Sequence, residues 1–188
     1  MKKKIGSFLM GFLALAMFAG CAHGPATGPS RLKVGDRAPT FTLADLETNQ
    51  QFETAKGFPD HVVTVEIIWS MACPTCREAL LECERVYQKY SGQSILFLGV
   101  NFDKENLNGI RAFIKSQGIT FPILWDPRAR VTRAYRALDF TFSAFVVDRE
   151  GRLRWVQYDH PPDFEALLTQ AMDKTIAEAV RENAGEKR

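Results

Sequence analysis

Apolar residues recur along the 188-residue chain in two kinds of pattern. Short runs rich in β-branched and aromatic residues predict strands at 62–68, 94–101, 121–125, 143–148 and 152–158. Apolar residues three and four apart predict helices at 77–90, 109–117, 127–138 and from 163 to about 182. A shorter alternation at 41–52, interrupted by Asn49-Gln50, predicts a hairpin before the first long strand.

The order of these elements after the hairpin predicts the architecture. An alternation of strands and helices that ends in two consecutive strands and a last helix predicts helices on both faces of one sheet. The two consecutive strands supply an antiparallel edge. We therefore expect an α/β fold, with a central mixed β-sheet flanked by helices and an N-terminal β-hairpin, in one domain over residues 34–188.

The first 33 residues have a different composition. Lys2-Lys3-Lys4 and a short apolar run indicate a signal peptide over 1–20, because the run is too short to span a bilayer. Phe18-Ala19-Gly20-Cys21 resembles a bacterial lipobox, which implies cleavage before Cys21 and lipid on its thiol; an ordinary signal or an uncleaved anchor is the alternative. Gly, Pro, Ala and Ser in 21–33 predict a flexible tether. We expect a lipid-anchored protein of the bacterial cell envelope that faces the periplasm, with the outer membrane favoured by Ala22.

The net charge of the chain bears on which partners are expected. The chain is formally +2, and losing the three signal-peptide lysines leaves −1. No basic patch is evident along the sequence, so nucleic acid is not an expected partner. Four arginines of the predicted helix at 127–138 are expected to be solvated: Arg128, Arg130, Arg133 and Arg136.

Two cysteines form a C-x-x-C pair, Cys73-Pro74-Thr75-Cys76, between a predicted strand and a predicted helix. The free N–H groups and the positive end of a helix dipole favour a thiolate, so the pKa of Cys73 should lie below the free value of about 8.5. Cys73 is then the exposed nucleophile and Cys76 the resolving thiol. Pro74 suits the first helical position.

Trp69-x-x-x-Cys73-Pro74-x-Cys76-Arg77 resembles the active-site segment of thioredoxin-like proteins, particularly the TlpA/ResA-type thiol-disulfide oxidoreductases. The segments at 34–43, 121–126 and 145–153 resemble other parts of that family. The resemblance implies a thioredoxin-like fold, with no cofactor and no metal ion. It implies protein thiol or disulfide substrates and an electron-transfer partner in the membrane or periplasm. Relatives include reductants in cytochrome c maturation and in disulfide homeostasis.

Three residues near the pair have an open role. Glu66 lies in the central strand, where it is either a proton relay for the dithiol or a structural carboxylate; the family's acid aligns with Ile67, and one residue of offset reverses the face of a strand. Glu78 is either a local acid or a solvated helix residue. Phe142 occupies the family's cis-proline position, so we expect a trans peptide there and a ring available to cover the dithiol or a substrate.

Alternative functions remain open at this point. Ala38-Pro39-x-Phe41 and Ser70 also occur in peroxiredoxin-like peroxidases. Two thiolates can bind Cu(I), as copper-delivering relatives do with a distal histidine, although we expect His160 to be a surface loop residue. A structural disulfide without turnover is a third alternative. Cys83, two helical turns after Cys76, is expected to be a buried, inert thiol.

Overall fold

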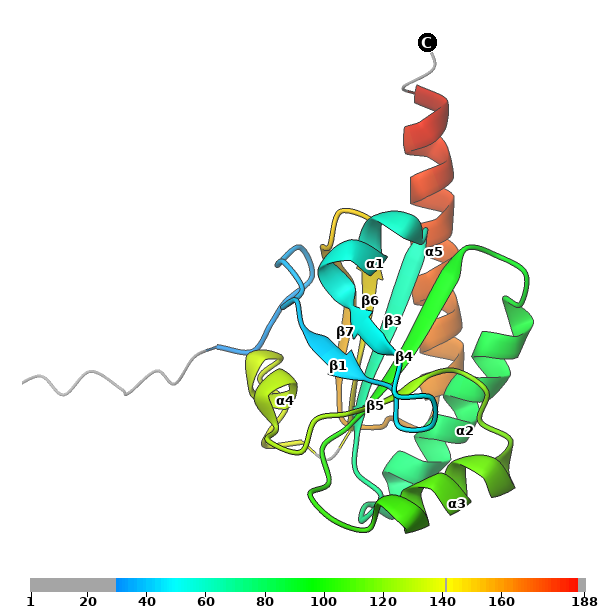
Figure 1. Cartoon of the computed structure of the whole chain (residues 1–188). Coiled ribbons are helices and arrows are strands. Elements are labelled where there is room, and N and C mark those ends of the chain that lie inside the picture. Colours follow the sequence, from blue (N-terminus) through cyan, green and yellow to red (C-terminus); the bar gives the residue numbers. More distant parts are fainter. Residues whose placement is uncertain (1–29, 141, 186–188) are drawn as a thin grey trace, which may run out of the picture.

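The computed structural model describes residues 30–140 and 142–185, and its centre is a five-stranded mixed sheet (Figure 1). The strands lie in the order β5-β4-β3-β6-β7. β3 is central, parallel to β4 and antiparallel to β6. The bounds are β3 (Val63–Trp69), β4 (Ile95–Asn101), β5 (Ile123–Trp125), β6 (Phe142–Asp148) and β7 (Leu153–Tyr158). The predicted thioredoxin-like sheet with an antiparallel edge is confirmed.

Helices cover both faces of this sheet (Figure 1). One core, on the face of β3 that carries Ile67 and Trp69, is covered by α2 (Pro74–Lys89), α3 (Leu107–Gln117) and α5 (Phe164–Gly185). A second core, on the face that carries Ile68, is covered by α1 (Thr54–Asp60) and α4 (Arg130–Ala134). We refer to these as the α2 face and the α4 face. Within the described ranges, none of the helices combines the length and the apolar composition that crossing a bilayer requires.

The predicted N-terminal hairpin is also present. β1 (Thr42–Ala44) pairs with β2 (Gln51–Glu53) in an antiparallel two-stranded sheet. The Asp45 carboxylate accepts main-chain hydrogen bonds from Glu47 at 3.0 Å and Thr48 at 2.7 Å, and Asn49 adopts a left-handed conformation with φ 58°. Asp and Asn tolerate such turns because their short side chains bond nearby backbone groups.

Three helices differ from the sequence predictions. α4 has only five residues in place of the predicted twelve, because Ala129 (φ 48°) and Arg136 (φ 57°) are left-handed and interrupt the helix on both sides. α1, with Gly57 and Pro59 inside seven residues, has no apolar repeat that predicts it. α2 begins at Pro74, three residues before the apolar repeat that predicts it, since the C-x-x-C segment forms its first turn and Pro74 takes the first helical position.

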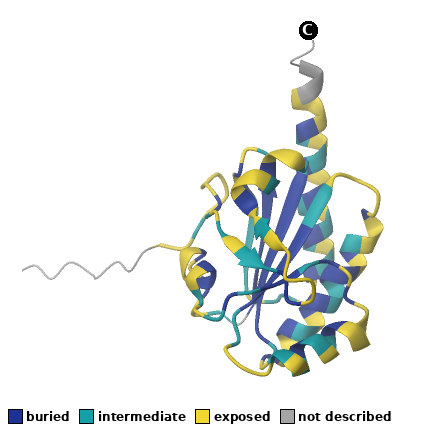
Figure 2. Ribbon diagram, viewed as in Figure 1, coloured by how far each residue is buried: buried dark blue, intermediate teal, exposed yellow. Residues whose placement is uncertain are grey.

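Burial is concentrated in the strands, which Figure 2 shows as the dark centre of the domain. Every residue of β3 is buried. Successive side chains of a strand point to opposite faces, so Ile67 and Trp69 contribute to the core on the α2 face, whereas Ile68 contributes to the core on the α4 face. The cysteine pair follows the carboxyl end of this strand.

Candidate active site

Cys73 and Cys76 form a disulfide at the start of α2. Cys73 is the N-cap residue, and its Sγ accepts a hydrogen bond from the backbone N–H of Cys76 at 3.1 Å. Their Cα atoms are 5.3 Å apart, within the usual range for a disulfide. Pro74 is the first helical residue, as predicted. The sequence therefore places both sulfurs where backbone N–H groups and the helix dipole stabilise negative charge.

The two sulfurs differ in access. Cys73 is 9% exposed and Cys76 is 0% exposed, so Cys73 is the cysteine that an incoming thiol or disulfide reaches first. Cys73 is nevertheless less exposed than the sequence analysis expected. Because the C-x-x-C segment packs as the first turn of α2 and both cysteines belong to the core on the α2 face, only a small part of Cys73 reaches the surface.

Thr75, between the cysteines, was not singled out from the sequence. Its exposed side chain places Oγ1 at 3.2 Å from the Sγ of Cys73. A hydroxyl rotates freely and can donate a hydrogen bond to a thiolate once the disulfide is reduced. Hydrogen bonding to the charged form lowers a pKa, so Thr75 is placed to make the Cys73 thiolate more accessible at neutral pH.

Asp103, in the loop after β4, holds the segment that precedes Cys73. Its carboxylate accepts hydrogen bonds from the Ser70 hydroxyl at 2.6 Å, the Met71 backbone N–H at 2.6 Å and the Asn101 amide at 2.9 Å. The indole N–H of Trp125, at the end of β5, donates to the Asp103 carbonyl at 2.9 Å. Asp103 thereby links the carboxyl ends of β3, β4 and β5 under the active-site loop.

Sequence reasoning missed Asp103 because it lies thirty residues after Cys73. The available signal was its position two residues after Asn101, at the end of a predicted strand. A polar residue at the carboxyl end of a parallel strand lies near the loops at the ends of the neighbouring strands.

Trp69, a predicted supporting residue, is fully buried. Its ring packs against Phe113 of α3 with centroids 6.1 Å apart, and its indole N–H has no hydrogen-bond partner within the described residues. Trp69 therefore lies in the core beneath the active-site loop, where it packs and does not touch a substrate.

Glu66 is buried on the α4 face, the opposite side of the sheet from the cysteines. Its Oε2 accepts a hydrogen bond from the hydroxyl of Tyr135, a residue of the core on that face, while Oε1 has no partner within the described residues. Burial raises the pKa of Glu66 to about 8, against the lowering effect of the Tyr135 hydrogen bond. The structure places Glu66 with Tyr135, and it does not bring Glu66 to the dithiol.

Glu78 and Cys83 lie on α2 at different depths. Glu78 is exposed to solvent, which fits the solvated helix residue of the sequence analysis. Cys83 is a free, fully buried thiol, as predicted. Burial raises its pKa well above the ordinary value, which disfavours the thiolate, the form that reacts in exchange.

Phe142 begins β6 and is enclosed. It is 1% exposed and lies 5.1 Å from the ring of Phe164 and 5.8 Å from that of His160, in both cases edge to face. The expectation of a ring free to cover a substrate is wrong, because the loop after β7 and the start of α5 pack over it. The predicted trans peptide before Phe142 involves Thr141, which lies outside the described residues.

His160 is held rather than free. Its Nε2 lies 3.0 Å from a carboxylate oxygen of Glu82 on α2, and its ring also packs against Phe164. The expectation of a surface loop histidine is wrong in this respect, since the side chain of His160 is only 13% exposed.

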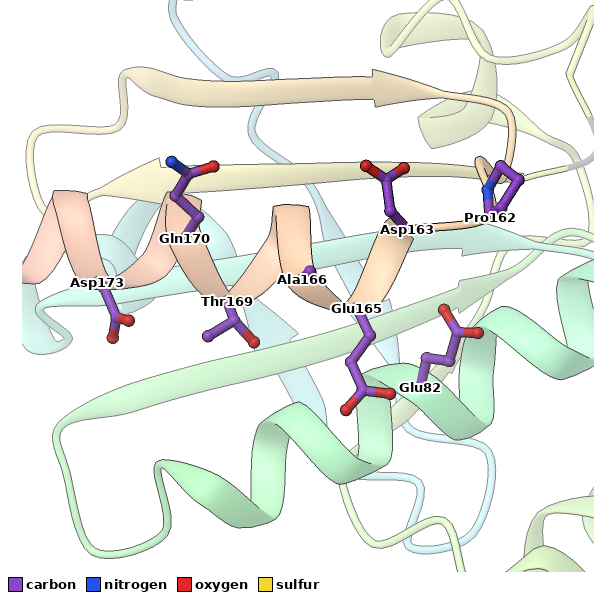
Figure 3. Close-up of a pocket in the computed structure, with 8 residues that line it drawn as sticks. All are labelled: Glu82, Pro162, Asp163, Glu165, Ala166, Thr169, Gln170 and Asp173. Atoms are coloured by element: carbon purple, nitrogen blue, oxygen red, sulfur yellow. The ribbon is translucent and has the colours of Figure 1, made fainter.

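A groove of about 590 Å³ runs between α2 and α5, and Figure 3 shows four carboxylates along it. Arg85 donates to Glu165 at 2.6 Å, and the Tyr90 hydroxyl donates to Asp173 at 2.6 Å. No group of three or more His, Cys, Asp or Glu within the described residues is arranged to hold a metal ion. The acidic lining is Glu82, Asp163, Glu165 and Asp173.

Known proteins that are similar to this chain include thiol-disulfide oxidoreductases. The chain is 28% identical over 128 residues to the thiol-disulfide oxidoreductase ResA of Geobacillus thermodenitrificans, covering 68% of this chain and 71% of the relative. It is 27% identical over 144 residues to a Mycobacterium tuberculosis protein that is provisionally named a peroxiredoxin, covering 71% of this chain and 89% of the relative.

A solved structure supports the fold. A protein of Chlorobium tepidum, provisionally assigned as the thiol:disulfide interchange protein DsbE, superimposes with a TM-score of 0.68 at 21% identity, covering 77% of this chain and 99% of that one. The family model named Redoxin matches residues 33–171. The predicted likeness to the TlpA/ResA type is confirmed, and the chain belongs to the Redoxin family.

Proposed function

We propose that this protein is a thiol-disulfide oxidoreductase of the ResA/DsbE type that acts through Cys73 and Cys76. The observation that carries the proposal is the disulfide at the N-cap of α2, where Sγ of Cys73 accepts the Cys76 N–H and lies beside the Thr75 hydroxyl. An N-cap sulfur next to two donors is stabilised as a thiolate, which is the form that reacts.

The exchange follows from the different access of the two sulfurs. In the reduced protein the Cys73 thiolate attacks one sulfur of a substrate disulfide, a mixed disulfide forms, and the other substrate sulfur leaves as a thiolate. Cys76, one turn on, then loses its proton and attacks Sγ of Cys73, which releases the second substrate sulfur. Two electrons pass from the dithiol to the substrate disulfide, the two substrate thiolates take up protons, and the protein ends as the Cys73–Cys76 disulfide.

The proposal extends to the cellular location of the protein and to its partners. We propose that lipid on Cys21 anchors the domain to the bacterial cell envelope, facing the periplasm, through the tether that ends at residue 33. The substrates are proteins with thiols or disulfides, and a membrane or periplasmic electron-transfer partner reduces the pair again. The proposed role is that of a reductant, in cytochrome c maturation or disulfide homeostasis. The support is the lipobox-like Phe18–Cys21 segment and the likeness to ResA.

A second candidate, a thiol peroxidase, is favoured by the relative named as a peroxiredoxin. The position of Ser70 counts against it. The Ser70 hydroxyl donates to Asp103 at 2.6 Å and accepts from the Ala72 backbone N–H at 3.2 Å, so it is engaged in holding the loop. The two candidates differ in the oxidant that the reduced protein consumes, which is a protein disulfide for one and a peroxide for the other.

Variants of the three described cysteines test the proposal. With the full chain and insulin as a disulfide substrate, Cys73→Ser should abolish reduction. Cys76→Ser should accumulate a mixed disulfide, and Cys83→Ala, which alters a buried thiol outside the pair, should retain reduction. Equilibration with glutathione should give a reduction potential near or below about −200 mV, as for reductants of this class. A disulfide that exchanges only in denaturant would show that the pair is a structural cross-link and would contradict the proposal. Rapid consumption of peroxide by the reduced protein would favour the peroxidase.

A further inference from the structure

Five exposed arginines gather around α4 and the start of the described chain. None of them forms an ion pair with a carboxylate within the described residues, and each side chain faces solvent. We call this set the arginine surface; its members are Arg31, Arg128, Arg130, Arg133 and Arg136.

Arg31 joins the others through two aromatic rings. Its guanidinium lies 4.3 Å from the centroid of the Phe140 ring and 5.4 Å from that of Tyr158. Burial raises the pKa of Tyr158; the charges of Arg31 and Arg136 lower it, and the charge of Asp36 raises it. Figure 1 shows the described chain beginning beside α4.

Arginines outnumber acids on this surface, although the charge of Asp36 also acts on Tyr158. Between 128 and 140 the sequence carries four arginines and one acid, Asp139. The nearby carboxylate of Asp126 is buried and already accepts hydrogen bonds from the backbone N–H groups of Arg130 at 2.8 Å and Thr132 at 3.1 Å. Leu138 is 49% exposed within the same segment. A basic surface with an exposed apolar side chain is complementary to the interface of an anionic bilayer.

We propose that the arginine surface rests on the anionic phospholipid of the membrane that holds the anchor, an inference that depends on the proposed lipidation of Cys21. Ser30, where the described chain begins, is nine positions after Cys21. A segment of this length spans at most about 30 Å. The tether therefore holds Arg31 and α4 at a high effective concentration at the lipid surface. Attraction to anionic lipid extends about one Debye length, roughly 8–10 Å at physiological ionic strength.

This contact orients the dithiol. α4 follows β5, and the cysteine pair follows β3; these strands are both parallel to β4, so both segments lie at the carboxyl end of the sheet. α4 packs on one face and α2 on the other. A membrane against the arginine surface keeps Cys73 at the membrane-proximal end of the domain while α2 remains uncovered. That arrangement suits exchange with a partner embedded in the same membrane.

Site-specific labelling of the anchored, full-length protein tests the orientation. In the oxidised chain Cys73 and Cys76 are bonded and Cys83 is buried, so a new exposed cysteine takes up a thiol-reactive dye selectively. Ala134→Cys puts the dye on α4. Gln93→Cys, exposed in the turn before β4 at the other end of the sheet, is the matched control. The vesicles contain a headgroup quencher in phosphatidylcholine, with or without phosphatidylglycerol.

We expect quenching at residue 134 to exceed that at residue 93 roughly two-fold or more in vesicles with phosphatidylglycerol, and the excess to vanish at about 1 M salt, where the Debye length is about 3 Å. Arg128→Glu with Arg133→Glu should remove it without altering insulin reduction. Equal quenching at both positions in a chain that floats with the vesicles overturns the orientation and leaves the anchor intact. A chain that does not float overturns both, and loss of insulin reduction alone concerns only the oxidoreductase.

Discussion

Two buried glutamates on opposite sides of the central sheet differ in how many hydrogen bonds their carboxylates accept. On the α2 face, the Glu84 carboxylate accepts hydrogen bonds from the Thr120 backbone N–H, the Thr120 hydroxyl and the Gln88 amide, at 2.6 to 2.8 Å. On the α4 face, one oxygen of Glu66 bonds to Tyr135 and the other has no partner within the described residues. A buried carboxylate that lacks donors becomes protonated more readily, because burial disfavours the charge.

The comparison bears on how an active site is recognised. Glu66 has a strongly raised pKa and lies seven residues before Cys73, yet the sheet separates the two side chains. Perturbed pKa values often mark functional sites. Here the raised pKa belongs to a carboxylate inside the α4 face, whereas the sulfur that we propose as the nucleophile is identified by its position at a helix start.

The largest expected effect comes from Glu66→Gln. The folded-state pKa of about 8 lies above the ordinary 4.5, so the proton that Glu66 holds stabilises the fold fully below pH 4.5, and this contribution is lost as pH rises through about 8. Each pKa unit corresponds to about 1.4 kcal/mol, which allows a loss on the order of 5 kcal/mol. Urea unfolding between pH 4.5 and 9 should show this decline in the wild type and a nearly flat profile in Glu66→Gln.

Glu78→Gln, which changes an exposed carboxylate of α2, is the control and should leave the decline in place. The same variants also test whether Glu66 on the α4 face affects Cys73 on the α2 face. Alkylation of reduced Cys73 should show the same dependence on pH in Glu66→Gln as in the wild type. A displaced alkylation profile would mean that Glu66 communicates with the dithiol through the sheet, contrary to the two-face description.

The sequence predicted the sheet well because the composition of a strand is a local property. The run of β-branched residues in 62–68 identified the buried central strand, and the C-x-x-C segment identified the start of α2. It left the face of Glu66 open, because one residue of register reverses every side chain of a strand. It overextended α4, whose ends depend on the left-handed conformations of Ala129 and Arg136, and no apolar repeat encodes those.

Contacts between distant segments were beyond local patterns. Asp103 meets Ser70 only because β3 and β4 pair in parallel, and Phe142 meets His160 only because the loop after β7 folds over the start of β6. The four arginines of the α4 segment could be identified in the sequence. The contact of Arg31 with the rings of Phe140 and Tyr158, which brings it to the same surface, could not. Tertiary packing decides such gatherings.

We expect Asp103→Ala to have an intermediate effect on stability and on the rate of exchange. Asp103 lies in the loop after β4, at the carboxyl ends of the strands. The change leaves the Ser70 hydroxyl, the Met71 N–H and the Asn101 amide without this acceptor. Lost partners of this kind cost about 1–3 kcal/mol, and we expect a loosened loop to slow insulin reduction by roughly ten-fold, since exchange requires an aligned Sγ.

Urea unfolding and the glutathione-equilibrated potential measure the two consequences. Glu105→Ala, an exposed neighbour in the same loop, should change neither. Asp103→Asn, which keeps one acceptor oxygen, should restore part of the rate. An Asp103→Ala protein with lower stability but unchanged rate and potential would confine Asp103 to a structural role, and the active-site loop would then be positioned by its own packing.

The smallest effect, Thr75→Val, tests the chemistry of the α2 face alone. The hydroxyl lies 3.2 Å from Sγ of Cys73 on an exposed side chain, so its removal should leave the unfolding free energy of the oxidised protein nearly unchanged. It should raise the pKa of reduced Cys73 by about one unit, the size of one hydrogen bond to a charged group. The pH dependence of iodoacetamide alkylation measures this shift, and Thr75→Ser should keep the wild-type value. If Thr75→Val also keeps it, the helix start alone stabilises the thiolate. If the pKa rises, one exposed hydroxyl controls reactivity on the α2 face, whereas the buried Glu66 carboxylate on the α4 face controls only stability.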